Sequence, residues 1–128
     1  MLSALLQGYV EETFLYASRR LFSTLRGDDL IKRYRGTYFR WGNPSHENIR
    51  ALFQRLGIDD VFDGLSWQNA SRNQIAVKLK RINEIRNKIA HGQQLPEALS
   101  LPKVRNLREF ADQFGRRFAP HVRGKLPR

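Results

Sequence analysis

Apolar residues along most of this chain recur every three or four positions, which is the spacing of an amphipathic α-helix. The clearest run covers residues 71–91, and its apolar positions are Ile75, Leu79, Ile82, Ile85 and Ile89. Ser71 followed by Gln74 is typical of a capping box at a helix start, and Gly92 is a typical helix stop. The pattern therefore predicts a helix over about residues 71–91 whose apolar face packs into a core.

The same spacing predicts three further main helices. The first covers about residues 2–25, with one stripe made of Leu2, Leu5, Leu6, Tyr9, Thr13, Ala17 and Leu21. Another opens at residues 43–45, ends at Gly57 and turns inward Ile49, Leu52, Phe53 and Leu56. The last covers about residues 100–119, with a core stripe of Val104, Leu107, Ala111, Phe114 and Phe118.

Shorter elements lie between these helices. Gly27 breaks the chain, and Asp28 or Asp29 is a candidate cap for a short helix that reaches about residue 39. Residues 59–67 are expected to form a short helical turn or a structured connector. Since no segment shows a strand pattern, we predict an all-α fold, an up-and-down four-helix bundle with short extra helices.

A chain of 128 residues is long enough for one domain with its own core, so we expect residues 1–128 to form a single helical domain. Pro120 is expected to stop or kink the last helix, which makes residues 120–128 a basic tail. The first helix starts without a capping residue, which is compatible with the chain being part of a longer protein.

The formal charge of +11 is concentrated on two of the predicted helices. Residues 71–91 carry six Lys and Arg against one acid, and residues 103–128 carry eight against two, whereas residues 36–70 carry three against four. This clustering favours a phosphate-rich partner such as nucleic acid, although a well-solvated basic face would show the same pattern.

Composition excludes several kinds of site. The chain has no cysteine, so neither a disulfide nor a thiol nucleophile is possible. Its three histidines, His46, His91 and His121, lack the spacing of zinc ligands, so we expect no metal and no other cofactor. Residues 1–10 are apolar but lack a basic start, and two glutamates follow at once. We therefore expect neither a signal peptide nor a membrane span, and a cytoplasmic protein.

Arg86 stands out in the helix over residues 71–91. At about 100° per residue it falls among the isoleucine and leucine side chains. A guanidinium there is costly unless a carboxylate pairs with it or a cleft lies beside it. Glu12 is the candidate partner, with Glu11 as an alternative. The same guanidinium could instead stabilise the charge on a phosphorane transition state, and the two roles are compatible.

His91, at the end of the same helix, also has two interpretations. It could interact with the helix dipole, which is common, or act as a general acid or base, because histidine titrates near neutral pH. Arg86 and His91 lie about 140° apart around an ideal helix, whereas Asn87 and His91 share a face. One straight helix therefore does not direct both groups at one phosphate. The helix could loosen at His91, Arg86 could reach round, or a second copy could supply the missing half.

The segment RNKIAHG, residues 86–92, at the end of an amphipathic helix resembles the signature of the HEPN superfamily. Its shared motif is an Arg, a following polar residue and a His after four to six intervening residues. Here these are Arg86, Asn87 and His91, with four residues between Arg and His. The stretches LLQGYVEETF and NIRALFQRLGI resemble the RiboL-PSP-type branch, so the resemblance spans roughly residues 2–119.

The resemblance implies a small α-helical protein that acts as a metal-independent endoribonuclease of toxin–antitoxin or antiphage type. It implies a homodimer in which two motifs face each other across a cleft at the twofold axis. The expected partners are RNA and either an antitoxin or a fused partner domain. The alternative is a non-catalytic HEPN-like module that binds RNA or a nucleotide, or that only dimerises.

In the implied reaction, His91 takes the proton of a ribose 2′-OH and Arg86 stabilises the phosphate oxygens, which yields a 2′,3′-cyclic phosphate and a 5′-OH. Asn87 is expected to orient the site, and the RNA backbone is guided by Lys80, Arg81 and Lys88. Residues 33–41 interleave arginines with aromatic residues. They could stack single-stranded bases, or they could be core aromatics flanked by solvated arginines.

Overall fold

The computed structural model describes residues 2–22, 25, 27–38, 44–68, 70–90, 92 and 101–126. These residues form five α-helices and no strand: α1 (Leu2–Leu21), α2 (Asp28–Tyr38), α3 (His46–Gln54), α4 (Arg72–Ala90) and α5 (Leu101–Lys125). The all-α prediction is therefore confirmed. Among the described helices, none has the length and apolar character needed to span a bilayer.

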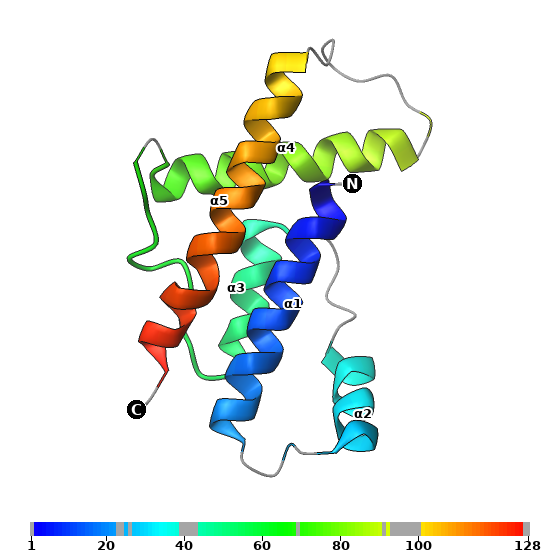
Figure 1. The fold of residues 1–128 in the computed structure, drawn as a ribbon, viewed down its shortest axis with the longest axis vertical. Coiled ribbons are helices and arrows are strands. Elements are labelled where there is room, and N and C mark those ends of the chain that lie inside the picture. The colour runs from blue at the N-terminus through cyan, green and yellow to red at the C-terminus, as the bar shows by residue number, and fades with distance from the viewer. Residues whose placement is uncertain are drawn as a thin grey trace.

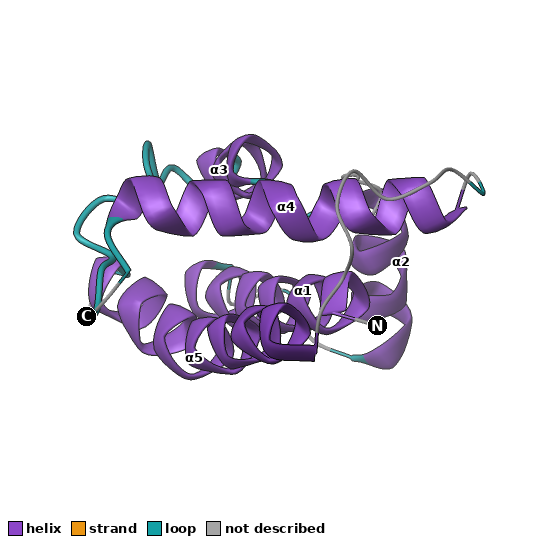
Figure 2. Cartoon of the chain, turned by 90° about the horizontal axis from the view of Figure 1, so that it is seen from above, coloured by secondary structure: helices purple, strands orange, loops and turns teal. Residues whose placement is uncertain are grey.

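The helices form two layers, with α2 at one side (Figure 1, Figure 2). α1 and α5 lie side by side in one layer, and α3 and α4 lie in the other. α4 runs across α1 and α5 rather than along them, and it contacts α1, α3 and α5. As a result, one long helix reaches three others and its C-terminal end extends past the N-terminal end of α1.

An aromatic cluster joins the layers at the centre of the core. The ring of Phe53 on α3 lies 5.6 Å from Phe14 on α1 and 5.5 Å from Phe118 on α5, both edge to face. Phe114 stacks on Phe118 at 4.8 Å. All four side chains have no exposed surface, and full burial of each contributes about 1.5–3 kcal/mol. These rings therefore hold α1, α3 and α5 in one core.

The core stripe of α1 agrees in part with the predicted one. Leu6, Thr13 and Ala17 are buried as predicted, whereas Leu2, Leu5, Tyr9 and Leu21 are only partly buried. Val10 and Phe14 are fully buried and were not predicted. The helix also ends at Leu21 and not near residue 25. Leu25 is nevertheless buried, so the chain remains against the core after the helix stops.

α3 agrees with the prediction. The Ser45 side chain accepts a hydrogen bond from the backbone N–H of Asn48, which caps the helix, and Ile49, Leu52 and Phe53 are buried. Gly57 has a φ of +83°, which a glycine adopts at little cost. For α2, Asp28 and Asp29 lie inside the first turn and do not precede it, so they complement the helix dipole.

α5 continues past the point where we expected it to end. Residues 120–125 are helical, and Pro120 lies inside the helix, so the expected basic tail is wrong for this segment. The reason is burial: Val122 is fully buried and Leu126 is 8% exposed, and they extend the stripe of Phe114 and Phe118 by two turns. Pro120 itself is exposed. The core contacts therefore offset the lost backbone hydrogen bond.

Candidate functional site

α4, which carries the RNKIAHG motif, begins with the predicted capping box. The backbone N–H of Gln74 donates to Ser71 Oγ at 3.3 Å, and the backbone N–H of Ser71 donates to Gln74 Oε1 at 2.7 Å. Two amide groups at the helix start are thereby satisfied. Ile75, Leu79 and Ile82 are at most 3% exposed, as predicted. These contacts hold the start and the middle of α4 against the core.

The motif residues lie at the other end of α4. Arg86 is half-buried and Asn87 is exposed, and each takes part in an interaction with another residue. Gly92 has a φ of +64°, which fits the predicted helix stop after Ala90. His91 and the side chain of Ile89 lie outside the described residues. The described part of the candidate site therefore consists of Arg86 and Asn87 near the C-terminal end of α4.

Arg86 follows the same helical register as Ile75, Leu79 and Ile82, so it lies at the edge of the buried face. Asn87 is rotated by about 100° toward solvent. Arg86 is half-buried, so part of this long side chain is accessible to solvent. A partly buried cation interacts more strongly with a phosphate than a fully solvated one, because less water screens it.

The structure pairs the predicted partner of Arg86 with another arginine. Arg35 Nη2 on α2 lies 3.4 Å from Glu12 Oε1, and the Glu12 side chain is 74% exposed. The ion pair therefore links α1 to α2 at the surface. Glu11 accepts a hydrogen bond from Gln7 Nε2 at 3.1 Å. The identity of the acid that pairs with Arg86 stays a prediction.

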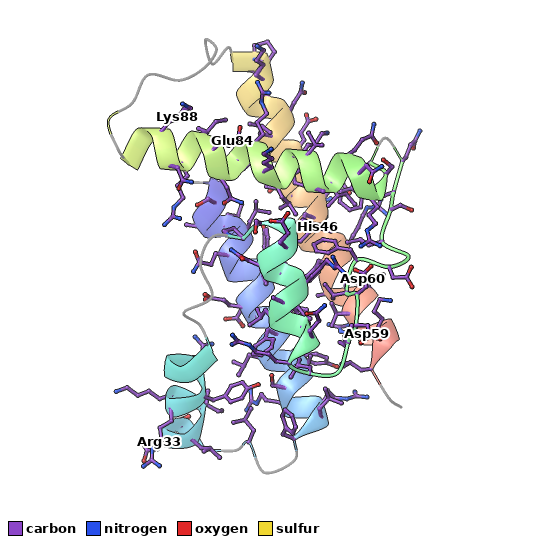
Figure 3. The ribbon with its side chains drawn as sticks, turned by 180° about the vertical axis from the view of Figure 1, so that it is seen from behind. Arg33, His46, Asp59, Asp60, Glu84 and Lys88 are labelled. Atoms are coloured by element: carbon purple, nitrogen blue, oxygen red, sulfur yellow. The ribbon has the colours of Figure 1, made fainter. Side chains whose placement is uncertain are left out.

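The predicted RNA-guiding cations lie on the outer surface of α4. The Lys80 side chain is 78% exposed and its Nζ lies 4.0 Å from Glu84 Oε1. Glu84 and Lys88 point away from α1 and α3 (Figure 3). Arg81 is half-buried and has an interaction partner. Lys80 and Lys88 are therefore positioned to meet a large anionic ligand, and Glu84 is the single acid among residues 72–90.

Asn83 is a polar residue of α4 that the sequence pattern did not single out. It is 6% exposed, and neither its amide nitrogen nor its amide oxygen has a hydrogen-bond partner among the described residues. A buried polar group left unpaired costs about 1–3 kcal/mol. Asn83 lies one turn before Arg86 and Asn87. The buried, unpaired side-chain amide and the motif are therefore in the same region of α4.

Another group missed by sequence reasoning lies where α3, α4 and the connector between them (residues 55–71) meet (Figure 3). Asp60 Oδ2 lies 2.5 Å from Arg72 Nη2, and Asp60 Oδ1 lies 3.3 Å from Arg50 Nε. Burial alone would raise the pKa of Asp60, but the hydrogen bonds from Arg72 and the Phe62 backbone, with the charges of both arginines, lower it overall. Asp60 is therefore a carboxylate that ties the connector to both helices.

His46, at the start of α3, stacks on Phe62 with ring centroids 4.3 Å apart. Burial lowers the pKa of His46, and the positive charges of Arg72 and Arg50 lower it further. Its imidazole is therefore neutral near pH 7. No sequence motif indicated this group, because its members are separated by up to 26 residues and only the fold brings them together. A histidine with a displaced pKa is a functional candidate, although structural networks have the same effect.

The aromatic segment on α2 is partly described. Tyr34 stacks on Phe14 at 6.0 Å, and its hydroxyl forms a 2.6 Å hydrogen bond with Ser18 Oγ. Tyr34 therefore holds α2 against α1, which agrees with the interpretation of core aromatics. Arg33 is exposed. Phe39 to Trp41 lie outside the described residues, and base stacking by them stays a prediction.

Within the described residues, no group of three or more His, Asp or Glu side chains is arranged to hold a metal ion. His121, the third histidine, has its Nε2 2.8 Å from the carbonyl oxygen of Val61, to which it donates. Burial lowers the pKa of His121, while that hydrogen bond opposes the shift. This side chain fastens α5 to the connector.

Comparison with known proteins adds one finding. The family described as RiboL-PSP-HEPN matches residues 1–122 of the chain. No curated protein and no solved structure gave a significant match. The match covers all five helices up to Val122 and contains the whole RNKIAHG segment. The chain therefore belongs to the RiboL-PSP-HEPN family.

Proposed function

We propose that this protein is a metal-independent endoribonuclease of toxin–antitoxin or antiphage type. The observation that carries the proposal is the family match over residues 1–122, which includes Arg86, Asn87 and the histidine four residues after Asn87. Family membership by itself indicates a ribonuclease-like or RNA-binding module. The intact Arg86 and His91 favour the enzyme, because a module that only binds RNA does not need a general base.

In the proposed reaction His91 removes the proton of a ribose 2′-OH, and the oxygen attacks the adjacent phosphorus. The bond from phosphorus to the 5′ oxygen breaks, and His91 of the second protomer gives that oxygen a proton. The products are a 2′,3′-cyclic phosphate and a 5′-OH. Arg86 stabilises the negative charge on the phosphate oxygens, and its partial burial strengthens that interaction.

The proposal includes a homodimer. Arg86 lies at the edge of the buried face of α4, and a residue five positions later lies about 140° away around an ideal helix. Two motifs that face each other across a twofold axis place an Arg and a His on either side of one phosphate. The C-terminal end of α4, which carries the motif, extends past the N-terminal end of α1 (Figure 2).

The test is to incubate purified protein with single-stranded RNA and, separately, with DNA of the same sequence in excess EDTA. We expect cleavage of RNA only, with 2′,3′-cyclic phosphate and 5′-OH ends, because DNA lacks the attacking hydroxyl. Cleavage that needs a divalent metal, or products with 3′-OH ends, would contradict the mechanism. Tight RNA binding without any cleavage would instead favour the binding module.

A further inference from the structure

An aromatic cavity lies between the start of α4, the middle of α5 and the connector, away from the motif end of α4. Its volume is about 490 Å³, within the range of about 300–1,000 Å³ that is usual for small-molecule sites. The rings of Trp67 and Phe110 form its apolar surface, with centroids 6.0 Å apart and planes 24° apart. Phe110 is 4% exposed and Trp67 is half-buried. Part of the Trp67 side chain is therefore accessible from solvent.

Two cations flank this aromatic pair. Lys78 Nζ lies 5.6 Å from the centroid of Phe110, and the Arg117 guanidinium lies 5.7 Å from the centroid of Trp67. Across the part of the chain that the structure describes, no carboxylate forms an ion pair with either cation. Arg117 Nε donates to Gln113 Oε1 at 3.0 Å, which is a neutral partner. Glu109 is the one acid that lines the cavity.

The remaining polar groups at the cavity are carboxamides, from Gln68, Asn106 and Gln113. Carboxamides donate and accept hydrogen bonds at once, which matches the edge of a nucleobase. The combination of an aromatic face, carboxamides and two cations without acidic partners fits a ligand that is planar, polar at its edge and anionic beside it. An unpaired nucleotide has these properties.

The position of the cavity connects it to the motif. Lys78 and Arg86 are eight residues apart on α4, so they lie about 12 Å apart along the helix axis and about 80° apart around it. A single strand that crosses Arg86 can therefore continue along α4 toward Trp67. The cavity lies outside the RNKIAHG segment, and none of the residues that line it belongs to the predicted site.

We propose that this cavity binds an unpaired base of the RNA strand, with the base against Trp67 and the neighbouring phosphates at Lys78 and Arg117. The choice of RNA as the ligand rests on the proposed function. The cavity would make the protein select single-stranded over double-stranded RNA, because a paired base must first break its pairing and stacking to reach the indole ring.

The direct test uses the fluorescence of Trp67. The chain has two tryptophans, so the full-length Trp41→Phe variant reports on Trp67 alone. Single-stranded DNA serves as the probe because the proposed reaction cannot cleave it, and binding is followed in parallel by anisotropy of a labelled strand. We expect the strand to quench Trp67, and we expect neither the same sequence in a duplex nor inorganic polyphosphate to quench it.

Matched variants separate stacking from charge. Trp67→Leu should weaken single-strand binding on the order of tenfold or more at every salt concentration, and Trp67→Phe should retain most of it. Lys78→Gln and Arg117→Gln should each lower the slope of log Kd against log salt by about 0.7. Two control variants, Lys32→Gln on α2 and Arg116→Gln on α5, each remove one positive charge from a residue that does not line the cavity. They should change the salt dependence of Kd less. Circular dichroism checks that each variant is folded.

The outcomes distinguish this inference from the proposed function. Binding by anisotropy without any change in Trp67 fluorescence overturns the inference and leaves the ribonuclease untouched. Equal quenching by polyphosphate also overturns it, because the cavity then recognises charge alone. Quenching with tight binding but no RNA cleavage supports the inference and contradicts the ribonuclease. Absence of single-strand binding in both readouts overturns the inference, and RNA cleavage in EDTA then decides the ribonuclease separately.

Discussion

At Gly115, α5 approaches α1 so closely that a Cβ atom would lie 2.5 Å from two carbons of the Tyr9 ring. A Cβ atom added to Gly8, on α1, would have no neighbouring side chain or other helix within 4 Å. Both are helical, so alanine should gain about 0.5–1 kcal/mol of helix propensity at each. Only at Gly115 must a half-buried ring move to make room. Glycine at position 115 therefore allows α1 and α5 to pack closely at this point.

We predict that Gly8→Ala raises the free energy of unfolding by up to about 1 kcal/mol, whereas Gly115→Ala lowers it by about 1–3 kcal/mol through overpacking. Urea unfolding of both variants measures this directly. Adding Tyr9→Ala to Gly115→Ala should remove the overpacking cost. Equal stabilisation by the two alanines would show that α1 and α5 are not packed as closely as described.

The histidines predict a pH dependence of stability. Burial lowers the pKa of both His46 and His121 below 6.5 in the folded state. The unfolded chain therefore binds more protons than the folded chain as the pH falls through about 6.5, and stability decreases. His46 faces Arg72, Arg50, Asp60 and Glu47, and His121 faces Lys125 and Asp63, so the arginines and the lysine add to the effect.

We expect the urea midpoint of the wild type to fall between about pH 7 and pH 5. The double variant His46→Gln, His121→Gln should show a smaller decrease over the same range. The lowered pKa of Asp60 acts in a separate window, because its contribution is lost only as the pH falls below about 4. An equal pH dependence in wild type and double variant would mean that the two histidines do not titrate as described.

Local patterns predicted the starts of α3 and α4 and the end of α4, whereas long-range contacts decided where α5 ends. The Ser71–Gln74 capping box and the Ser45 cap depend on residues three positions apart, and both form as expected. The extension of α5 depends on Val122 and Leu126 packing against residues distant in sequence. The effect of proline on the local backbone predicts only where a helix is weakened, so it could not predict the stabilisation from these buried side chains.

We predict that Pro120→Ala stabilises the protein by about 1–3 kcal/mol. The side chain is exposed within a continuous helix, and alanine restores a backbone hydrogen bond, while the lost stiffness of the unfolded chain reduces the gain. Differential scanning calorimetry measures the effect. An unchanged unfolding temperature would indicate that residues 120–125 fray in solution.

The sequence predicted the contiguous part of the candidate site but not the groups that the fold brings together. RNKIAHG is contiguous, so the sequence alone located Arg86 and Asn87 at the end of a helix. The His46 group, buried Asn83 and the Trp67–Phe110 pair were not foreseen, because each depends on which surfaces the fold brings together. The pairing of Glu12 with Arg35 has the same origin, since α2 approaches α1 only in the folded chain.

For the molecule as a whole, the proposed mechanism requires two copies of the chain at one active site. Because the proposed reaction uses His91 of both protomers at one phosphate, a mixed dimer of a wild-type and a His91→Ala protomer should lack either the general base or the general acid. After subunit exchange with excess His91→Ala protein, RNA cleavage should therefore fall well below the share of wild-type protomers. Cleavage that stays proportional to the wild-type share, although native mass spectrometry shows mixed dimers, would contradict a shared site.

The rate of RNA cleavage in EDTA by wild type and by His91→Ala tests whether His91 is the general base. Because a general base contributes about 10²–10⁴-fold, the variant should cleave slower by that factor. We expect its unfolding temperature to be nearly unchanged, since the residue follows the last helical position of α4. A His91→Ala protein that cleaves RNA at the wild-type rate would contradict the account.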